Sequence, residues 1–156
     1  MFGDSINYKI IRITSHNSSN HIALRNVIRM TDRFWHYDYS KAHMNAKDAF
    51  VHEITHLWQE QNGVDLIKHA VSAYLEHNGV YADAYKYRLE EVTDFTALNI
   101  EQQASFVDDY FRWRRNLDQT RYLDNTTLTC KKIHKFEEVL KPVFTDLQPH
   151  QRCKPA

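Results

Sequence analysis

The chain of 156 residues has the length of one domain, which can bury about two thirds of its unfolded surface in a core. Lysine plus arginine and aspartate plus glutamate number 20 each, so no net field attracts nucleic acid or an anionic membrane, and we expect neither as a partner. With 13% aromatic residues, three glycines and three prolines, the composition is that of a packed globule, and we expect a single domain over residues 1–148.

The N-terminal segment predicts a small sheet. Two stretches rich in β-branched residues, Tyr8–Thr14 and Ile22–Met30, flank the turn-forming stretch Ser15–Asn20 and predict two strands. The aromatic stretch Arg33–Tyr37 predicts a short third strand. The opening MFGDSINYKIIRI contains an early acidic residue and no long apolar run, so we expect no signal peptide and synthesis in the cytoplasm.

A helix is predicted over Asn45–Asn62, because this run lacks Pro and Gly and is followed by Gly63, where a left-handed cap costs least. The helix contains the pattern HEITH from His52 to His56. Two imidazoles four residues apart on a helix can hold one zinc ion, while the glutamate between them, Glu53, acts on a zinc-bound water. The pattern therefore indicates a zinc hydrolase.

The helical context strengthens the motif, which a shuffled chain of this composition would contain about once in thirty trials. At about 100° per residue, one face of the helix is apolar and the motif histidines lie on the opposite face. The apolar face comprises Phe50, Ile54, Leu57 and Trp58, and the opposite face carries His52, His56 and Gln59. A pair of imidazoles that points away from the core together favours metal ligands over core histidines.

Two further helices are predicted after the motif. Apolar residues recur at helical spacing over Asp65–His77, and the following Asn78-Gly79 predicts a left-handed stop. Tyr81–Leu89 is expected to be a loop that could hold an extended piece at AYKYRL. From Thr93 to Trp113 the chain again lacks Pro and Gly, and Thr93 or Asp94 can cap the start of a helix.

The C-terminal part predicts a closing helix over Lys131–Leu140, which ends before Pro142, and a disordered basic tail over residues 149–156. Cys130 and Cys153 are too few for a disulfide framework. They form a free pair or, in an oxidising compartment, one bridge, and we place them outside any metal site.

The third ligand must come from another part of the chain, because a catalytic zinc ion takes three protein ligands and keeps a position open for water. The pattern H-E-x-x-H-x-x-G-x-x-H is excluded, since LWQEQN follows His56. Glu101 is the best candidate, because the side chains within about 60° of it on a helix wheel are small or acidic and allow close approach to the motif helix. The alternatives are Glu90, Glu91, His69 and His77.

The segments FVHEITHLWQEQNGV and DFTALNIEQQASFVDDYF resemble the H-E-x-T-H-x-W-Q and N-I-E-Q-Q-A blocks of a metallopeptidase family. Its members occur as free proteins or as C-terminal extensions of VgrG spike proteins in bacterial type VI secretion systems. The segments FGDSINYKIIRI and ALRNVIRM resemble the N-terminal pattern of this family, so the resemblance spans about Phe2–Tyr110.

This resemblance implies an α+β, mainly helical, gluzincin-like zincin domain with a small N-terminal sheet. It also implies that His52, His56 and Glu101 bind Zn²⁺ and that Glu53 is the catalytic base. The family association implies a secretion spike carrier, an immunity protein, and delivery into the periplasm of a target bacterium, where the protein is toxic.

The chain departs from thermolysin-like gluzincins four residues after the ligand glutamate, where those enzymes have an aspartate and this chain has Ser105. Asp108 or Asp94 could instead hydrogen-bond a ligating imidazole. A donor to the developing oxyanion is also expected, and spacing does not choose among the candidates. These candidates are Tyr85, Tyr87, Tyr110 and His134.

The expected activity is hydrolysis of amide bonds, either in a protein or in a peptide cross-link of the cell wall. Zinc would lower the pKa of its water and polarise the scissile carbonyl, while Glu53 passes a proton from the water to the leaving amine. Two non-enzymatic alternatives stay open: a secretion module in which zinc only staples two helices, and a helical interaction domain in which HEITH is a coincidence.

Overall fold

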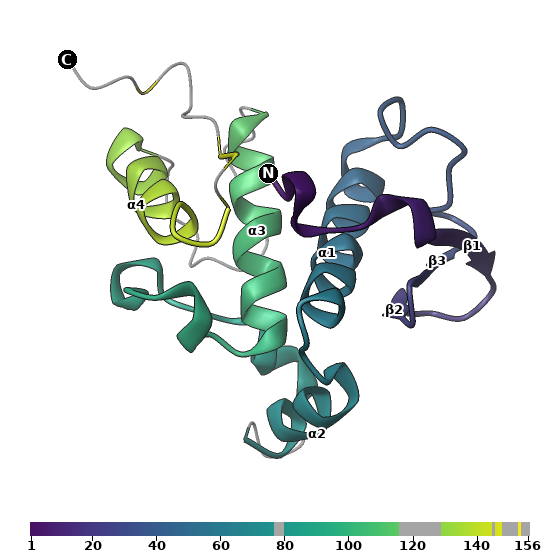
Figure 1. Cartoon of the computed structure of the whole chain (residues 1–156). Helices are drawn as coiled ribbons and strands as arrows, with labels where there is room; N and C mark the ends of the chain where they lie inside the picture. Colours follow the sequence, from purple (N-terminus) through teal and green to yellow (C-terminus); the bar gives the residue numbers. More distant parts are fainter. Residues whose placement is uncertain (77–79, 116–128, 145, 148–152, 154–156) are drawn as a thin grey trace.

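The regular structure consists of a three-stranded sheet and four α-helices in the residues that the computed structural model describes, which are 1–76, 80–115, 129–144, 146–147 and 153. The central helix α1, Met44–Gln61, lies between the sheet and α3, Ile100–Arg114 (Figure 1). Helix α4, Cys130–Leu140, packs on α3, and α2, Leu66–Glu76, lies at one end of α1 and α3. The predicted α+β class is confirmed.

The sheet has the order β1-β3-β2, with β1 (Arg12–His16) parallel to β3 (Val27–Thr31) and β2 (Ile22–Leu24) antiparallel to it. The prediction of one strand over Ile22–Met30 was wrong, because a turn divides this segment into β2 and β3. Arg25 and Asn26 form the turn at φ values of 51° and 59°.

A side chain of α1 holds this turn in place. The Glu60 carboxylate accepts hydrogen bonds from the backbone N–H groups of Arg25, at 2.9 Å, and Asn26, at 3.1 Å. These contacts cross 34 or more residues of sequence, so the local pattern of β-branched residues could not reveal them. They fix the hairpin, and with it β2, beside α1.

Two other strand predictions need correction. Residues Tyr8–Ile10 form a 3₁₀-helix, so the first strand begins only at Arg12. Arg33–Tyr37 is not a strand, because the chain turns directly after β3: the N–H groups of Phe34 and Trp35 both bond to the carbonyl of Thr31, at 2.8 and 3.0 Å. This tight turn leads the chain back toward the start of α1.

The motif helix and the closing helix are confirmed. Helix α1 spans Met44–Gln61 and is followed by Gly63, whose φ of 90° lies in the left-handed region where glycine has no steric penalty. Helix α4 spans Cys130–Leu140 and ends before Pro142. Helix α2 matches its prediction to within a residue at each end, and the expected stop at Asn78-Gly79 lies outside the described residues.

Helix α3 begins later than predicted. Asn99 caps it through a reciprocal pair of hydrogen bonds with Gln102, whereas Asp94 caps the separate 3₁₀-helix Phe95–Ala97 by accepting from the N–H of Thr96 at 2.8 Å. Before it, the expected loop over 81–89 contains the 3₁₀-helix Tyr81–Tyr85 and leads into the 3₁₀-helix Leu89–Glu91. Glu101 therefore lies in the first turn of α3.

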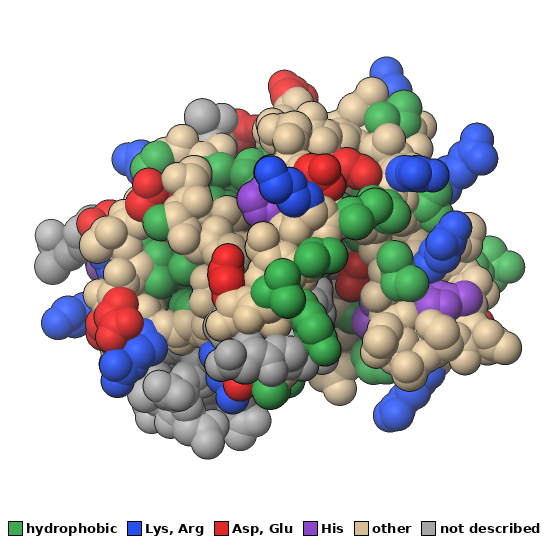
Figure 2. All heavy atoms as spheres, turned by 90° about the horizontal axis from the view of Figure 1, so that it is seen from below, with side chains coloured by type: hydrophobic (Ala, Val, Ile, Leu, Met, Phe, Trp, Pro, Cys, Tyr) green, Lys and Arg blue, Asp and Glu red, His purple; other side chains and the backbone are tan. Residues whose placement is uncertain are grey.

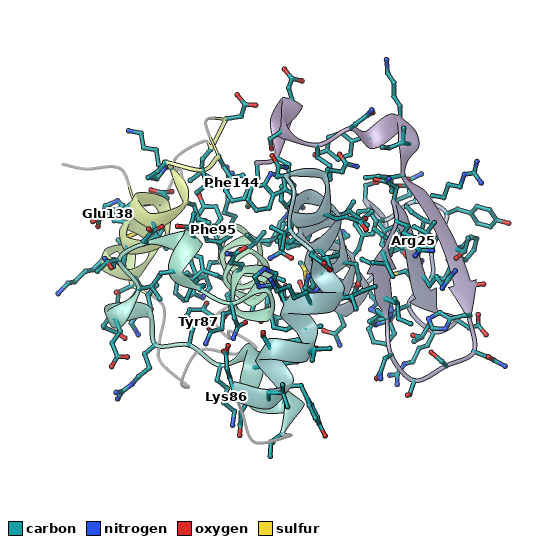
Figure 3. The ribbon with its side chains drawn as sticks, turned by 60° about the horizontal axis from the view of Figure 1, so that its bottom comes forward. Arg25, Lys86, Tyr87, Phe95, Glu138 and Phe144 are labelled. Carbon is teal, nitrogen blue, oxygen red and sulfur yellow. A yellow bond between two sulfur atoms is a disulfide. The ribbon has the colours of Figure 1, made fainter. Side chains whose placement is uncertain are left out.

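Apolar side chains form two clusters, one on each side of α1. The sheet packs Ile28 and Met30 against Ile54 and Leu57 of α1. The second cluster is aromatic and joins α3 to α4 and the 3₁₀-helices, and Figure 3 labels three of its members. It includes Tyr87, Phe95, Phe106, Tyr110, Trp113, Phe136 and Phe144. With both flanks packed, α1 and α3 form a fixed pair.

The C-terminal region is tied to α4 through Cys130, which forms a disulfide with Cys153. The carbonyl of Cys153 also accepts a hydrogen bond from Nε2 of His134, at 2.5 Å. Cys153 is buried, while the other residues of the predicted tail, 149–152 and 154–156, lie outside the described residues. In the described part of the chain, no helix is long and apolar enough to cross a membrane.

Candidate metal centre

Three predicted ligands meet at the seam between α1 and α3. His52 and His56 lie one turn apart on α1, and their ring centroids are 4.9 Å apart. The same carboxylate oxygen of Glu101, Oε2, lies 3.2 Å from Nε2 of His52 and 3.3 Å from Nε2 of His56. All three side chains are buried. One ligand atom from each residue lies within 4.8 Å of the others, so this group could bind a metal ion.

Two of the three separations between the candidate ligand atoms fit a tetrahedral ion. Two ligand atoms that are each about 2.0 Å from a tetrahedral zinc centre lie about 3.3 Å from one another. The measured separations of 3.2 and 3.3 Å between Glu101 Oε2 and the imidazole Nε2 atoms match this value. Two imidazole nitrogens and one carboxylate oxygen are also a donor set that zinc accepts in catalytic sites.

The described alternatives, His69, Glu90 and Glu91, do not belong to this group of ligand atoms. His69 is exposed on α2, and Glu90 and Glu91 are exposed in a 3₁₀-helix, where Glu91 pairs with Arg88 at 2.9 Å. His77 lies outside the described residues. Of the candidate third ligands that the structure describes, Glu101 is the one within 3.3 Å of both imidazoles.

Charges within the centre shift the pKa values of its members. Burial alone would lower the pKa of His56, but the adjacent carboxylate of Glu101 outweighs burial and raises this pKa to about 9. Burial opposes ionisation of Glu101 as well, yet the charge of His56 and hydrogen bonds from both histidines hold its pKa well below the usual range. Without an ion, these shifts favour a protonated His56 opposite the carboxylate of Glu101.

Glu53 lies beside the three ligands and is also buried. Burial raises the pKa of its carboxyl group to about 7, with a smaller upward contribution from the charge of Glu101 and a downward one from His56. A carboxyl group with a pKa near neutrality can take up and release a proton under physiological conditions.

Gln59 orients His56, a role that the sequence analysis did not assign. The Nε2 group of Gln59 donates to the carbonyl of Ile100 and to Oε1 of Gln103, both at 2.9 Å. A carbonyl can only accept, so the amide oxygen of Gln59 must face Nδ1 of His56, which lies at 2.8 Å. His56 therefore carries its proton on Nδ1 when neutral, and its Nε2 lone pair is directed toward the centre.

The hydrogen-bond donor and acceptor of the next amide, that of Gln103 on α3, are fixed in the same way. The Nε2 group of Gln103 donates to the carbonyl of Leu98 at 3.0 Å, which leaves Oε1 of Gln103 to accept from Gln59. Gln102 anchors the start of the helix by its capping bonds and by donating to the carbonyl of Lys86 at 2.8 Å. The two glutamines that follow Glu101 thus fix its helix against α1 and against the preceding loop.

The two aspartates predicted to orient a ligating imidazole, Asp94 and Asp108, lie in different environments. Asp94 caps a 3₁₀-helix, as described above, and is exposed. Asp108 is fully buried on α3, and its charge helps to raise the pKa of Tyr87, behind the larger effects of burial and of Asp109. An orienting role for Asp108 stays a prediction.

A cleft of about 560 Å³ opens onto the centre. One wall is formed by residues 20–24, which include the edge strand β2, and another by Leu66, Ile67 and Ala70 at the start of α2. Tyr85 lines the cleft and its ring lies 5.6 Å from that of His52. The buried centre is thereby accessible from one side.

Of the four candidate oxyanion donors, Tyr85 is the one at the cleft. The hydroxyl of Tyr87 donates to Asp109 at 2.8 Å, and that of Tyr110 donates to Glu137 at 3.2 Å. Both tyrosines belong to the second apolar cluster. His134 bonds to the carbonyl of Cys153. Spacing in the sequence could not make this choice, because it depends on the 3₁₀-helix that carries Tyr85 to the side of His52.

The fold and the centre together define an α+β domain with a His-His-Glu site built from an H-E-x-x-H helix and a second helix. Comparison with known proteins relates it to one secretion protein. The chain is 32% identical over 124 residues to the type VI secretion system spike protein VgrG2b of Pseudomonas aeruginosa, an alignment that covers 71% of this chain and 12% of the spike protein.

The solved effector domain of Pseudomonas aeruginosa VgrG2b superposes with a TM-score of 0.63 at 27% identity, covering 92% of this chain and 75% of that domain. No family model matches the chain. The relationship to VgrG proteins that the two helical blocks predicted is confirmed by both similarities. Since the chain spans about an eighth of the spike protein, the resemblance lies with its effector domain.

Proposed function

We propose that the chain is a zinc-dependent peptidase that acts as a type VI secretion effector and hydrolyses amide bonds in the periplasm of a target bacterium. The observation that carries this proposal is the meeting of His52, His56 and Glu101 at ligand spacing, beside the buried Glu53 and at the base of a cleft. A coincidental HEITH pattern gives no reason for a carboxylate from α3 to lie within 3.3 Å of both imidazoles.

His52, His56 and Glu101 would hold the ion, with Gln59 fixing the tautomer of His56. When bound, zinc supplies a Lewis acid that lowers the pKa of water to about 7 and polarises a carbonyl group. The protein excludes bulk solvent around these ligands, since all three are buried and the cleft opens on one side.

Glu53 would act as the general base and then as the general acid. Its carboxylate takes a proton from the attacking water, and the resulting carboxylic acid gives that proton to the leaving amine. The burial that raises its pKa to about 7 favours both halves of this transfer. The hydroxyl of Tyr85 would donate a hydrogen bond to the oxyanion that develops on the scissile carbonyl.

The edge strand β2 suits a polypeptide substrate. It forms one wall of the cleft and, among the described residues, pairs only with β3, so its other edge could accept an extended peptide as an added strand. Backbone hydrogen bonds to β2 would place a peptide along the cleft, with an amide bond next to Glu53 and the ligands.

Delivery by a spike carrier is supported by the similarity to VgrG2b and its effector domain. The Cys130–Cys153 disulfide suits the periplasm, because disulfides persist in oxidising compartments and are rare in reducing cytosol. An immunity protein in the periplasm of the producing cell would be the expected second partner.

The deciding experiment compares the wild-type protein with Glu53→Gln, which keeps the side-chain volume and removes the base. About one zinc per chain should be found by elemental analysis in both proteins, while hydrolysis of an unfolded protein and toxicity in the periplasm should disappear in the variant. A matched control is Glu138→Gln, the same change at an exposed glutamate of α4 outside the cleft. Unchanged toxicity of zinc-loaded Glu53→Gln would contradict the peptidase proposal.

A non-catalytic, zinc-stapled module is the second candidate, favoured by the origin of the ligands on two different helices. Chelation separates the two functions. A structural zinc contributes folding energy, so its removal should unfold the domain, whereas the hydrogen bonds of Gln59 and the flanking cores should keep a catalytic domain folded without zinc. Circular dichroism after treatment with a chelator distinguishes these outcomes.

A further inference from the structure

We infer that the α2 wall of the cleft selects the substrate, and that it favours polypeptide segments with apolar side chains over the carboxylate-bearing peptide cross-links of the cell wall. This inference rests on the proposed function and names the substrate class of the same site. It follows from the distribution of apolar side chains on α2, from their exposure, and from the charges of the cleft.

Helix α2 is apolar over about half of its circumference, and its polar side chains share the other half. Taking Ile67 as zero at about 100° per residue, the apolar residues whose side chains the structure describes lie between about −100° and +80°. In angular order they are Leu66, Ala70, Tyr74, Ile67, Val71 and Leu75. The flank with Leu66 packs into the protein, while the rest of the arc faces solvent. Packing within the described part of the chain therefore buries only part of the apolar face of α2.

The solvent-facing part of the arc is a stripe of Ile67, Val71, Tyr74 and Leu75, each between 48% and 67% exposed. Seen from the α2 end of the molecule, hydrophobic side chains gather near the middle of this face (Figure 2). The stripe meets the cleft at Ile67, which belongs to both. A contiguous apolar stripe of this kind marks a binding surface more often than an isolated exposed residue does.

The opposite wall of the cleft, formed by β2, is also apolar. Ile22, Ala23 and Leu24 of the edge strand β2 line the cleft, and Ile22 is 43% exposed. An extended peptide paired with β2 would direct alternate side chains to opposite faces, so that one set points toward α2. Apolar side chains at these positions would cover Ile67 and the adjoining stripe.

Charge disfavours the other substrate class. Glu101 and the two imidazoles would hold the zinc ion, and the described residues that line the rest of the cleft include no lysine or arginine. Peptide cross-links of cell walls carry free carboxylates close to the scissile amide. Carboxylate recognition in proteins relies on cationic partners, above all the paired donors of arginine. A neutral polypeptide backbone needs no such partner.

The test measures binding separately from hydrolysis. Zinc-loaded Glu53→Gln is titrated, by fluorescence anisotropy, with labelled peptides of one backbone that carry leucine and phenylalanine, or aspartate and glutamate, and with a cell-wall cross-link peptide. We expect the apolar peptide to bind at least about tenfold more tightly than either of the others. Equal binding, preference for an acidic peptide, or no binding of any peptide would overturn the inference.

Ile67→Asp in the same background should weaken binding of the apolar peptide by about tenfold, and Ile67→Leu should restore it. The matched control is Ile13→Asp, the same change at an exposed isoleucine of β1 outside the cleft. Unchanged affinity in Ile67→Asp would place the stripe outside the substrate site and assign it to a protein partner instead.

Hydrolysis by the wild-type protein then separates the two proposals. Selective binding by Glu53→Gln without hydrolysis by the wild-type protein would remove the peptidase proposal and leave the apolar binding surface. Hydrolysis of the cross-link peptide at the rate of the apolar peptide, or faster, would support the peptidase and refute the selectivity.

Discussion

Replacement of Gln59 by leucine tests how His56 is held. The variant has a side chain of similar volume but removes the acceptor at 2.8 Å from Nδ1 of His56 and the donor at 2.9 Å from the carbonyl of Ile100 and from Oε1 of Gln103. His56 is buried, so its N–H group loses its partner at a cost of about 1–3 kcal/mol, while Gln103 is half-buried and can bond to water. The free energy of unfolding of the metal-free protein should fall by about 2 kcal/mol.

The zinc affinity of the same variant should fall by about 10–100-fold, the usual effect of losing the partner that orients a ligating imidazole. Gln59→Glu should separate orientation from stability. Its carboxylate still accepts from Nδ1 of His56 and preserves zinc affinity within a few fold, but it faces the carbonyl oxygens of Ile100 and Gln103 and therefore destabilises the fold.

Competition for zinc against a chromophoric chelator gives the affinities, and urea unfolding of the metal-free proteins gives the stabilities. Gln61→Leu is the control, because Gln61 lies on the same helix and bonds to Asn26 at 2.8 Å, away from the centre. It should lower stability and leave zinc affinity unchanged. Wild-type zinc affinity in Gln59→Leu would refute the orienting role.

Three further predictions concern the ion, the pH and the disulfide. Glu101→Ala should lower zinc affinity by more than about a hundredfold, since it removes a ligand and not only its support; an affinity close to that of the wild type in the same chelator assay would exclude Glu101 as a ligand. In the metal-free protein, the raised pKa values of Glu53, about 7, and His56, about 9, favour the protonated forms in the folded state. Glu53 and His56 stabilise the folded state fully below their ordinary pKa values, and this stabilisation is lost as the pH rises through about 7 and about 9. The pKa of Glu101 is lowered, so its stabilising contribution is already complete above its ordinary pKa and does not change over this range. The Tm of the metal-free protein should therefore fall between about pH 5 and 9, and a rising Tm over this range would contradict the assignment. Cys130→Ser should lower the free energy of unfolding of the oxidised protein by about 3 kcal/mol, from a sequence separation of 23, and should have no effect under reducing conditions; an equal loss in both would show that packing and not the cross-link matters.

The sequence predicted that His52, His56 and Glu101 would lie together because each signal was local. The HEITH helix has a continuous helical pattern with a glycine stop, and the wheel position of Glu101 among small side chains indicated the helix that approaches it. The start of α3 could also have been predicted, since Asn99 and Gln102 have the spacing of a capping box. The absence of Pro and Gly from Thr93 onward favoured the longer helix and concealed this boundary.

The remaining errors involve contacts between distant segments. Glu60 holds the turn at Arg25 and Asn26, so a run of β-branched residues that reads as one strand becomes a hairpin. The role of Gln59 as the partner of His56 was missed for the same reason. Gln59 lay on the same wheel face as the histidines, but its role depends on carbonyl and amide groups of α3, which only the packed structure brings within 2.9 Å.

The seam between α1 and α3 explains how a cluster of buried charges can exist before an ion binds. The partly buried Arg112 of α3 forms an ion pair with the buried Asp48 of α1, three turns beyond Glu101 and one turn before His52. At the other end of the seam, Gln59 binds α3 through its amide. The ligands lie between these two polar contacts, each of which loses bonds if the helices slide or rotate. Their separation is therefore set by the fold, and the binding energy of the ion is not spent on bringing the helices together. Such an arrangement favours a catalytic centre, which needs ligands that keep their geometry while substrate enters and product leaves.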